Sequence, residues 1–291
     1  MRRTITIAVV ILIASVAAHG QTPEPPELQN QEAKREINEG ALAYRARNYY
    51  EAQLHFERAM TLDPTFKTSR LFYARAIHAQ YKPGDESPEN VAKARAAVSA
   101  YEQYFEIDPV NDDAPNAIIY LYRMIKDEEA ERRWLKRLAE DENRPAERRA
   151  QALTVLASKD WQCSYNVTEE SENKRTITSR DRVILTYVMP KDRSEFARAG
   201  QCATRGLELA DTAVALAPES EQAWSFKTNL LLELTKLAQM EGSRERLVTL
   251  QKQADEAQKR TSELNEQNRK KREAEEKEKV EGSQRPPYAQ R

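Results

Sequence analysis

The sequence is poor in the residues that most often build reactive sites and tight turns. Its 291 residues include only 7 Gly, 3 His and 2 Cys. The glycines are not clustered, which excludes a glycine-rich loop that cradles a phosphate. Charged residues make up 32% of the chain, and its long segments consist mostly of Leu, Ala, Glu, Lys, Arg and Gln, which favour helices. The composition predicts an all-α protein.

An excess of positive charge is also missing. The formal net charge is −1 at pH 7. A chain without an overall basic field has little to attract a phosphate backbone. We therefore expect no nucleic-acid partner.

The shortage of histidine limits catalysis and metal binding. Beyond residue 20 only His55 and His78 remain, and neither stands near a Cys or an acidic residue in a familiar ligand spacing. A Ser or Cys nucleophile would need a base within hydrogen-bonding reach, and two scattered histidines rarely supply one. We expect no catalytic residues, no metal site and no cofactor, and hence no enzyme.

No hydrophobic run reaches the roughly 20 residues that span a bilayer. The longest, residues 5–18, follows Arg2 and Arg3 and leads to small residues before a cleavage point at Gly20. This pattern is typical of a secretory signal peptide over residues 1–20, and a membrane anchor is the alternative. Cleavage predicts a periplasmic or secreted protein with no membrane span.

Whether the two cysteines, Cys163 and Cys202, form a disulfide depends on whether the protein is exported. Thiols oxidise in exported compartments, so we expect a disulfide between them. Two unpaired, buried cysteines are the alternative. A bridge over this separation would stabilise the fold by roughly 4 kcal/mol in the chain-entropy model.

Small and aromatic residues recur at fixed spacing early in the chain. Gly40, Ala52 and Ala59 are positions where two helices cross closely, Phe56 fills the gap between repeats, and Pro64 stops the second helix. The spacing therefore predicts a helical hairpin.

The same arrangement returns towards the C-terminal end. Gly206, Ala210 and Ala213 stand at the close-crossing positions, and Pro218 follows the helix. Trp224 follows six residues after Pro218. The recurrence predicts a second helical hairpin built on the same plan.

These stretches resemble the tetratricopeptide repeat (TPR), and residues 31–264 resemble an exported bacterial TPR protein. The resemblance implies an α-solenoid of stacked antiparallel helical hairpins, with an inner groove that holds peptides or partner helices. Ile37 and Ala41 stand where the family's carboxylate clamp has Lys and Asn. Recognition of chaperone tails is therefore not expected.

The pattern divides the chain into unequal parts. Residues 31–160 are the predicted N-terminal repeats, and residues 192–264 a C-terminal repeat with a long helix. The helical period fails over residues 161–191, where two short runs, residues 162–167 and 182–188, predict a hairpin or an irregular loop. The remaining parts are a flexible linker at residues 21–30 and a charged, fraying tail at residues 265–291.

Carried over residue by residue, the resemblance implies a partner-binding groove. Arginines among polar and aromatic neighbours suit an acidic or carboxylate-ended peptide, because guanidinium pairs with carboxylate in a fork. Ordinary solvated helix positions are the alternative. The predicted groove residues are Asn38, Tyr44, Arg45, Arg75, His78, Asn116, Tyr120 and Arg123.

Two functions fit these observations. One is an exported adaptor or scaffold that holds a protein or peptide partner in its groove, in envelope assembly or secretion. The other is a structural protein that forms homo-oligomers by pairing an apolar seam of its C-terminal helix, residues 247–264, with a second copy. Both are roles in protein association.

Overall fold

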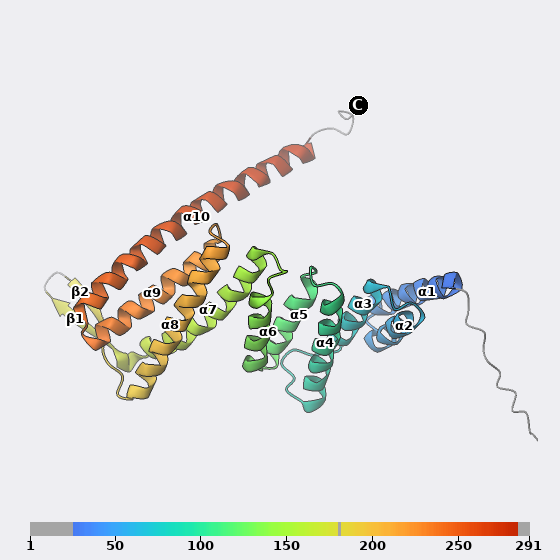
Figure 1. Cartoon of the computed structure of the whole chain (residues 1–291), viewed down its shortest axis with the longest axis horizontal. Helices are drawn as coiled ribbons and strands as arrows, with labels where there is room; N and C mark the ends of the chain where they lie inside the picture. The colour runs from blue at the N-terminus through green and yellow to red at the C-terminus, as the bar shows by residue number, and fades with distance from the viewer. Residues whose placement is uncertain (1–25, 180–181, 285–291) are drawn as a thin grey trace, which may run out of the picture. The chain divides into compact units, whose positions relative to one another are not determined.

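The fold is taken from a computed structural model that describes residues 26–179 and 182–284. The predicted signal peptide and residues 21–25 lie outside these ranges. Within them the chain forms ten α-helices, a short 3₁₀ helix and one two-stranded hairpin (Figure 1). The predicted all-α class is confirmed. The chain divides into two compact units, one up to Gln80 and one from Tyr81, and each is described by itself.

The first unit consists of three helices that pack in sequence order. They are α1 (Pro26–Arg45), α2 (Tyr49–Leu62) and α3 (Lys67–His78), and α2 packs against both of the others. Arg47 turns the chain between α1 and α2 in the left-handed conformation, with φ at 64°. Since α1 begins at Pro26, it includes the last part of the predicted linker.

The helices α1 and α2 cross at Gly40. A Cβ atom on Gly40 would lie 2.7 Å from Cε1 of Phe56, so no side chain fits there. On the same helix as Phe56, Ala52 and Ala59 are fully buried, and α2 ends shortly before Pro64. A small residue on one helix and an aromatic ring on the other thus let the two backbones approach closely.

The second unit begins with three helices after a long turn. These are α4 (Pro88–Ile107), α5 (Asp113–Met124) and α6 (Glu128–Glu140), and each packs against the next. The turn before α4 is closed by the buried side chain of Asn90, which donates to the carbonyl of Lys82 and accepts from its N–H, both at 2.8 Å. The helical-hairpin plan predicted from the sequence therefore continues here.

The helix α7 (Ala146–Thr168) corrects the predicted insertion. Residues 162–167 were predicted as part of a hairpin or an irregular loop, and this was wrong, because α7 runs straight through them. Val167 is buried in a core with residues of α8, α9 and α10, and this packing favours the helix over the short alternating pattern of residues 162–167. The non-helical part is shorter, with a 3₁₀ helix (Ser171–Asn173), β1 (Lys174–Ser179) and β2 (Arg182–Tyr187).

The two strands form an antiparallel hairpin that a buried ion network ties to α9. Lys236 Nζ donates to Glu169 Oε1 at 2.7 Å and to Glu233 Oε1 at 2.6 Å. The Tyr187 hydroxyl on β2 donates to Glu169 at 3.1 Å. Burial raises the pKa of Glu169, but hydrogen bonds, led by that from Lys236, outweigh burial and hold its pKa at about 2.

Three long helices complete the second unit, α8 (Arg193–Leu216), α9 (Glu221–Glu241) and α10 (Arg244–Gln284). Helix α7 packs against α8 and α9, α8 against α9, and α9 against α10 (Figure 1). A Cβ atom on Gly206 would lie 2.6 Å from Cδ2 of Leu230 on α9. This crossing is as close as the one at the start of the chain.

The other residues of the second predicted hairpin also lie at contacts. Ala210 and Ala213 on α8 are buried. Trp224 on α9 donates its Nε1–H to the carbonyl of Pro218 at 2.9 Å, which fixes the turn between the two helices. Gly242 ends α9 in the left-handed conformation, with φ at 74°.

The apolar seam of α10 is buried inside the chain. Leu250, Ala254, Ala257 and Leu264 are each at most 9% exposed, and the first three belong to a core with leucines of α9. The prediction that residues 247–264 pair with a second copy was wrong, because α9 already covers this face.

A disulfide joins α7 to α8. Cys163 and Cys202 are bonded, with their Cα atoms 6.0 Å apart, so the predicted pairing is confirmed. Within the described ranges no helix is both long enough and apolar enough to cross a bilayer. The 41-residue α10 has the length but is rich in Lys, Arg and Glu.

Candidate functional site

A pocket opens in the first unit among α1, α2 and α3. Its volume is about 370 Å³, and both apolar and cationic side chains line it. Tyr44, Arg45 and Arg75 of the predicted groove are among them. The full lining is Ala41, Tyr44 and Arg45 from α1, Phe56 from α2, and Phe72 and Arg75 from α3.

Phe56 and Phe72 form the aromatic floor of this pocket. Their ring centroids lie 5.4 Å apart and the rings are tilted by 49°. Both pack into a small core with Ala52 and Ala76. Tilted aromatic pairs add about 0.5–1.5 kcal/mol beyond the burial of their area. The floor is therefore held in place by the packing of the unit itself.

Two arginines bring positive charge to the rim. Cζ of Arg75 lies 5.7 Å from the centroid of the Phe72 ring, a cation–π contact that holds the guanidinium over the floor. Arg45 is exposed in the last turn of α1. Among the residues that the structure describes, no carboxylate pairs with Arg45. The rim thus presents an apolar surface beside a guanidinium that can bind an anion.

Tyr44 adds a neutral polar group to the rim. Its ring meets that of Tyr49 edge to face, with centroids 5.2 Å apart. Burial raises the pKa of the Tyr44 hydroxyl, Tyr49 raises it further, and Arg75 opposes the shift. The hydroxyl therefore stays protonated at neutral pH and can donate a hydrogen bond.

The structure places the other predicted residues of this unit outside the pocket. Asn38 is exposed on α1, and His78 is partly buried near the end of α3. Burial lowers the pKa of His78, so its imidazole is neutral at pH 7. Neither side chain lines the pocket.

The predicted residues of the second unit lie together on α5. Asn116, Tyr120 and Arg123 are exposed at positions that share one helix face. Nη2 of Arg123 lies 3.0 Å from Oε1 of Glu131, a buried carboxylate that Lys159 also binds at 2.7 Å. The charge of Arg123 is therefore compensated within the chain, which weakens its prediction as an anion-binding residue.

A larger groove, lined mostly by charged and polar residues, runs past the disulfide in the second unit. It has a volume of about 700 Å³, and its lining includes Arg132, Lys159 and Arg205. Asp160 is fully buried and binds Arg132 at 2.9 Å and Arg205 Nε at 2.7 Å. Both arginines are therefore paired within the chain, whereas no carboxylate pairs with Arg45 among the described residues, and this favours the pocket of α1, α2 and α3 as the site for an anionic partner.

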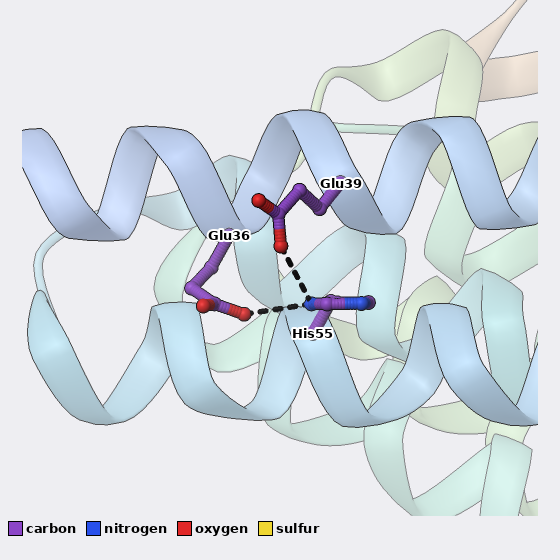
Figure 2. Close-up of side chains that lie close together, drawn as sticks. All are labelled: Glu36, Glu39 and His55. Atoms are coloured by element: carbon purple, nitrogen blue, oxygen red, sulfur yellow. Dashed lines mark hydrogen bonds and ion pairs between the residues drawn. The ribbon is translucent and has the colours of Figure 1, made fainter.

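A second arrangement of polar residues lies between α1 and α2. Figure 2 shows Glu36 and Glu39 of α1 pointing towards His55 of α2. Nδ1 of His55 lies 2.7 Å from Oε2 of Glu36 and 3.6 Å from Oε2 of Glu39. The three ligand atoms all lie within 4.8 Å of one another.

Sequence analysis missed this cluster, because it considered ligand spacings within single helices. Glu36 and Glu39 are one turn apart, which places them on one face of α1. Glu39 and His55 stand equally far from the turn residue Arg47, so an antiparallel hairpin brings them to the same level. This equal spacing predicts the cluster only when the position of the turn is known.

No family model and no curated protein matches the sequence. Several solved structures are similar in their arrangement of helices. A double mutant of MamA has a TM-score of 0.42 at 14% identity, covering 82% of this chain and 98% of its own. YrrB, described as a TPR protein with an unusual peptide-binding site, has a TM-score of 0.36 at 13% identity, with coverages of 78% and 95%. The TPR2AB domain of yeast Sti1, in a complex with pHSP90, has a TM-score of 0.35 at 14% identity, with coverages of 86% and 97%.

Two of these three proteins are of the TPR type by description, the type that the sequence motif resembles. At these identities and TM-scores, we carry over no residue, ligand or partner from them to this chain.

Proposed function

We propose that this chain is an exported scaffold that binds a protein or peptide partner through the pocket of α1, α2 and α3. The observation that carries the proposal is an aromatic floor beside two arginines. The floor is made by Phe56 and Phe72, and the cations are Arg45 and Arg75. The partner segment offers an apolar side chain next to a carboxylate.

The physical chemistry of the pocket supports both parts of this ligand. Burying apolar surface gains about 25 cal/mol per Å², and the partly exposed ring of Phe72 supplies such a surface above the buried ring of Phe56. A hydrogen bond between a guanidinium and a carboxylate contributes about 1.5–3 kcal/mol. A segment with an apolar side chain and a carboxylate gains both energies. A basic segment gains only the energy of apolar burial, and its charge is repelled by the arginines.

The size of the pocket limits what it holds. Ligand pockets range over roughly 300–1,000 Å³, and this pocket, at about 370 Å³, is at the lower end. It suits one or two side chains of a bound segment. The rest of the segment would lie along the exposed faces of α1 and α3.

The residues of the pocket favour binding over catalysis. General acid–base catalysis needs a group that exchanges a proton near the working pH, most often His and also Glu, Asp, Lys, Tyr or Cys. Among these residue types the described lining contains only Tyr44, whose pKa is raised above its ordinary value by burial, so its hydroxyl keeps its proton at neutral pH. We therefore propose a binding protein and not an enzyme.

The disulfide supports an oxidising compartment. Bonds such as that between Cys163 and Cys202 persist in secreted and periplasmic proteins and are rare where thiols are kept reduced. Together with the predicted signal peptide, this supports export. A scaffold in that location would hold its partner during envelope assembly or secretion.

Fluorescence anisotropy with labelled peptides tests the proposal. Three peptides of equal length share one phenylalanine and differ in the residue beside it, which is Asp, Asn or Lys. We expect the Asp peptide to bind at least about 10-fold more tightly than the Lys peptide, since tenfold corresponds to 1.4 kcal/mol. Arg45→Glu should remove this preference.

A matched control is Arg58→Glu, which makes the same charge change at an exposed position of α2 outside the pocket lining. It should bind all three peptides as the unchanged chain does. Equal affinity of the unchanged chain for the acidic and basic peptides, or equal effects of the two substitutions, would contradict the proposal.

A further inference from the structure

We propose that Glu36, Glu39 and His55 bind one divalent transition-metal ion of the Zn²⁺ type, which links α1 to α2. The proposal rests on the geometry of these three side chains and is independent of the peptide pocket. It assigns a role to His55, which lies between two carboxylates (Figure 2).

The ligand atoms converge on one point. Both carboxylates direct an oxygen at the same atom, Nδ1 of His55, at 2.7 Å and 3.6 Å. A ring nitrogen carries at most one proton, so it can donate to one of the two carboxylates at a time. A cation bound in front of the nitrogen would bind all three groups at once.

The distances are close to those a tetrahedral ion needs. Zinc binds imidazole nitrogen at about 2.0–2.1 Å and carboxylate oxygen at about 2.0–2.2 Å. In a tetrahedron, bonds of that length place neighbouring ligand atoms roughly 3.3–3.5 Å apart. The Glu39 oxygen, 3.6 Å from Nδ1 of His55, lies slightly beyond this spacing, and the Glu36 oxygen, at 2.7 Å, lies inside it, so both carboxylates would shift slightly to hold the ion.

Burial gives the site an electrostatic reason to take a cation. Glu36 is 8% exposed, and a charged carboxylate is costly to bury without a compensating partner. Its hydrogen-bond partner in the structure is the ring of His55, and the carboxylate of Glu39 approaches the same ring nitrogen. A divalent ion would balance the two carboxylates completely.

The ligand set also selects the type of metal. Imidazole nitrogen suits Zn, Cu, Fe and Ni, whereas Ca²⁺ and Mg²⁺ prefer all-oxygen sites. Three protein ligands leave a fourth position for water or for a group of a partner. We therefore expect Zn²⁺ and Co²⁺ to bind and Ca²⁺ and Mg²⁺ to be excluded.

The ion would stabilise the hairpin that carries the pocket. Its ligands lie on α1 and α2, the helices that also provide Tyr44, Arg45 and Phe56. A ligand that binds only the folded state stabilises it in proportion to the logarithm of its concentration. Bound metal would thus slow the separation of α1 from α2.

Titration calorimetry with Zn²⁺ alone tests the site. The protein carries no tag and is purified with a chelator, which is then removed by dialysis. We expect one Zn²⁺ per chain, no heat with Mg²⁺ or Ca²⁺, and slower hydrogen exchange in α1 and α2 after Zn²⁺ is added. Co²⁺ should give visible absorption bands of a tetrahedral site. Glu39 is half-exposed, so Glu39→Gln should fold normally and weaken binding at least about 10-fold.

His55→Gln should abolish binding, with circular dichroism to check that the helices remain. Two control variants make the same kinds of substitution outside the site. Glu57→Gln changes an exposed carboxylate of α2 and His78→Gln changes the histidine of α3, and both should bind Zn²⁺ normally. The proposal is overturned by an absence of stoichiometric binding in the unchanged chain, or by Glu39→Gln and His55→Gln variants that bind as it does.

Discussion

Gly206 on α8 lies so close to Leu230 on α9 that a Cβ atom on the glycine would be 2.6 Å from Cδ2 of the leucine and 3.0 Å from Cβ of Asp160 on α7. Both neighbours are fully buried and have little room to move. Gly206→Ala should therefore lower the free energy of unfolding by about 1–3 kcal/mol, the usual cost of overpacking. Urea unfolding followed by tryptophan fluorescence measures this, because all three tryptophans, Trp134, Trp161 and Trp224, belong to the second unit.

The same helix offers a matched control. Nothing lies within 4 Å of a Cβ atom on Gly200, so Gly200→Ala meets no obstacle. Alanine is favoured over glycine inside a helix by roughly 0.5–1 kcal/mol. This variant should be more stable than the unchanged chain, and a similar loss of stability in both variants would contradict the close-crossing argument.

Stability at low pH should depend on Glu169. Its pKa is about 2 in the folded chain and 4.5 ordinarily, so its contribution is complete above about pH 4.5 and is lost as pH falls towards 2. The contribution is on the order of 1–3 kcal/mol. Glu169→Gln should lower the urea midpoint at pH 6 and leave a flatter dependence on pH below 4.5.

Glu170→Gln is the control for that measurement. Glu170 is the exposed neighbour of Glu169, so its removal should leave the pH dependence unchanged. If the two variants show the same profile between pH 5 and 2, the network around Lys236 does not set the acid stability of this unit.

Reduction of the disulfide should destabilise the second unit. Cys163 and Cys202 are separated by 39 residues, and closing a loop of that length stabilises a fold by roughly 4 kcal/mol in the chain-entropy model. A thiol reductant should therefore lower the urea midpoint. The double variant Cys163→Ser and Cys202→Ser should show the lower midpoint without reductant and no further change with it.

Asp160 should be one of the most sensitive positions in the second unit. It is fully buried and binds Arg132 and, through two hydrogen bonds, Arg205. Breaking a buried ion pair typically costs about 3–5 kcal/mol, and we expect about 3 kcal/mol for Asp160→Asn, which keeps the shape. Glu172→Gln removes an exposed ion pair with Lys191 and should leave the urea midpoint unchanged.

The helical-hairpin plan could be predicted because it depends on local signals. The order of Gly40, Phe56 and Pro64 follows from how two neighbouring helices pack, and the same is true of Gly206 and Trp224. Contacts between neighbours in sequence leave a regular spacing in the chain, which is visible without coordinates. Three of the residues that line the pocket, Tyr44, Arg45 and Arg75, were predicted as groove residues from the resemblance to the tetratricopeptide repeat.

The errors arose where packing outweighs local preference. Residues 162–167 have a short alternating pattern that was read as a strand, yet they are helical, and Val167 is buried against α8 and α9. The seam of α10 has the spacing of a helix that pairs with another, but periodicity does not say which helix covers it. In this chain α9 does, so the seam is internal.

The sequence by itself determined the all-helical class, the repeat plan and the identity of the only two cysteines that could pair. The tertiary structure decided which side chains from different helices meet, namely Arg45, Phe56 and Phe72 around one pocket, and Glu36 and Glu39 with His55. The reason is physical. Helix formation and hairpin packing depend on residues a few positions apart, whereas a binding site depends on the height and rotation of one helix against another, and these are fixed only when the whole interface packs.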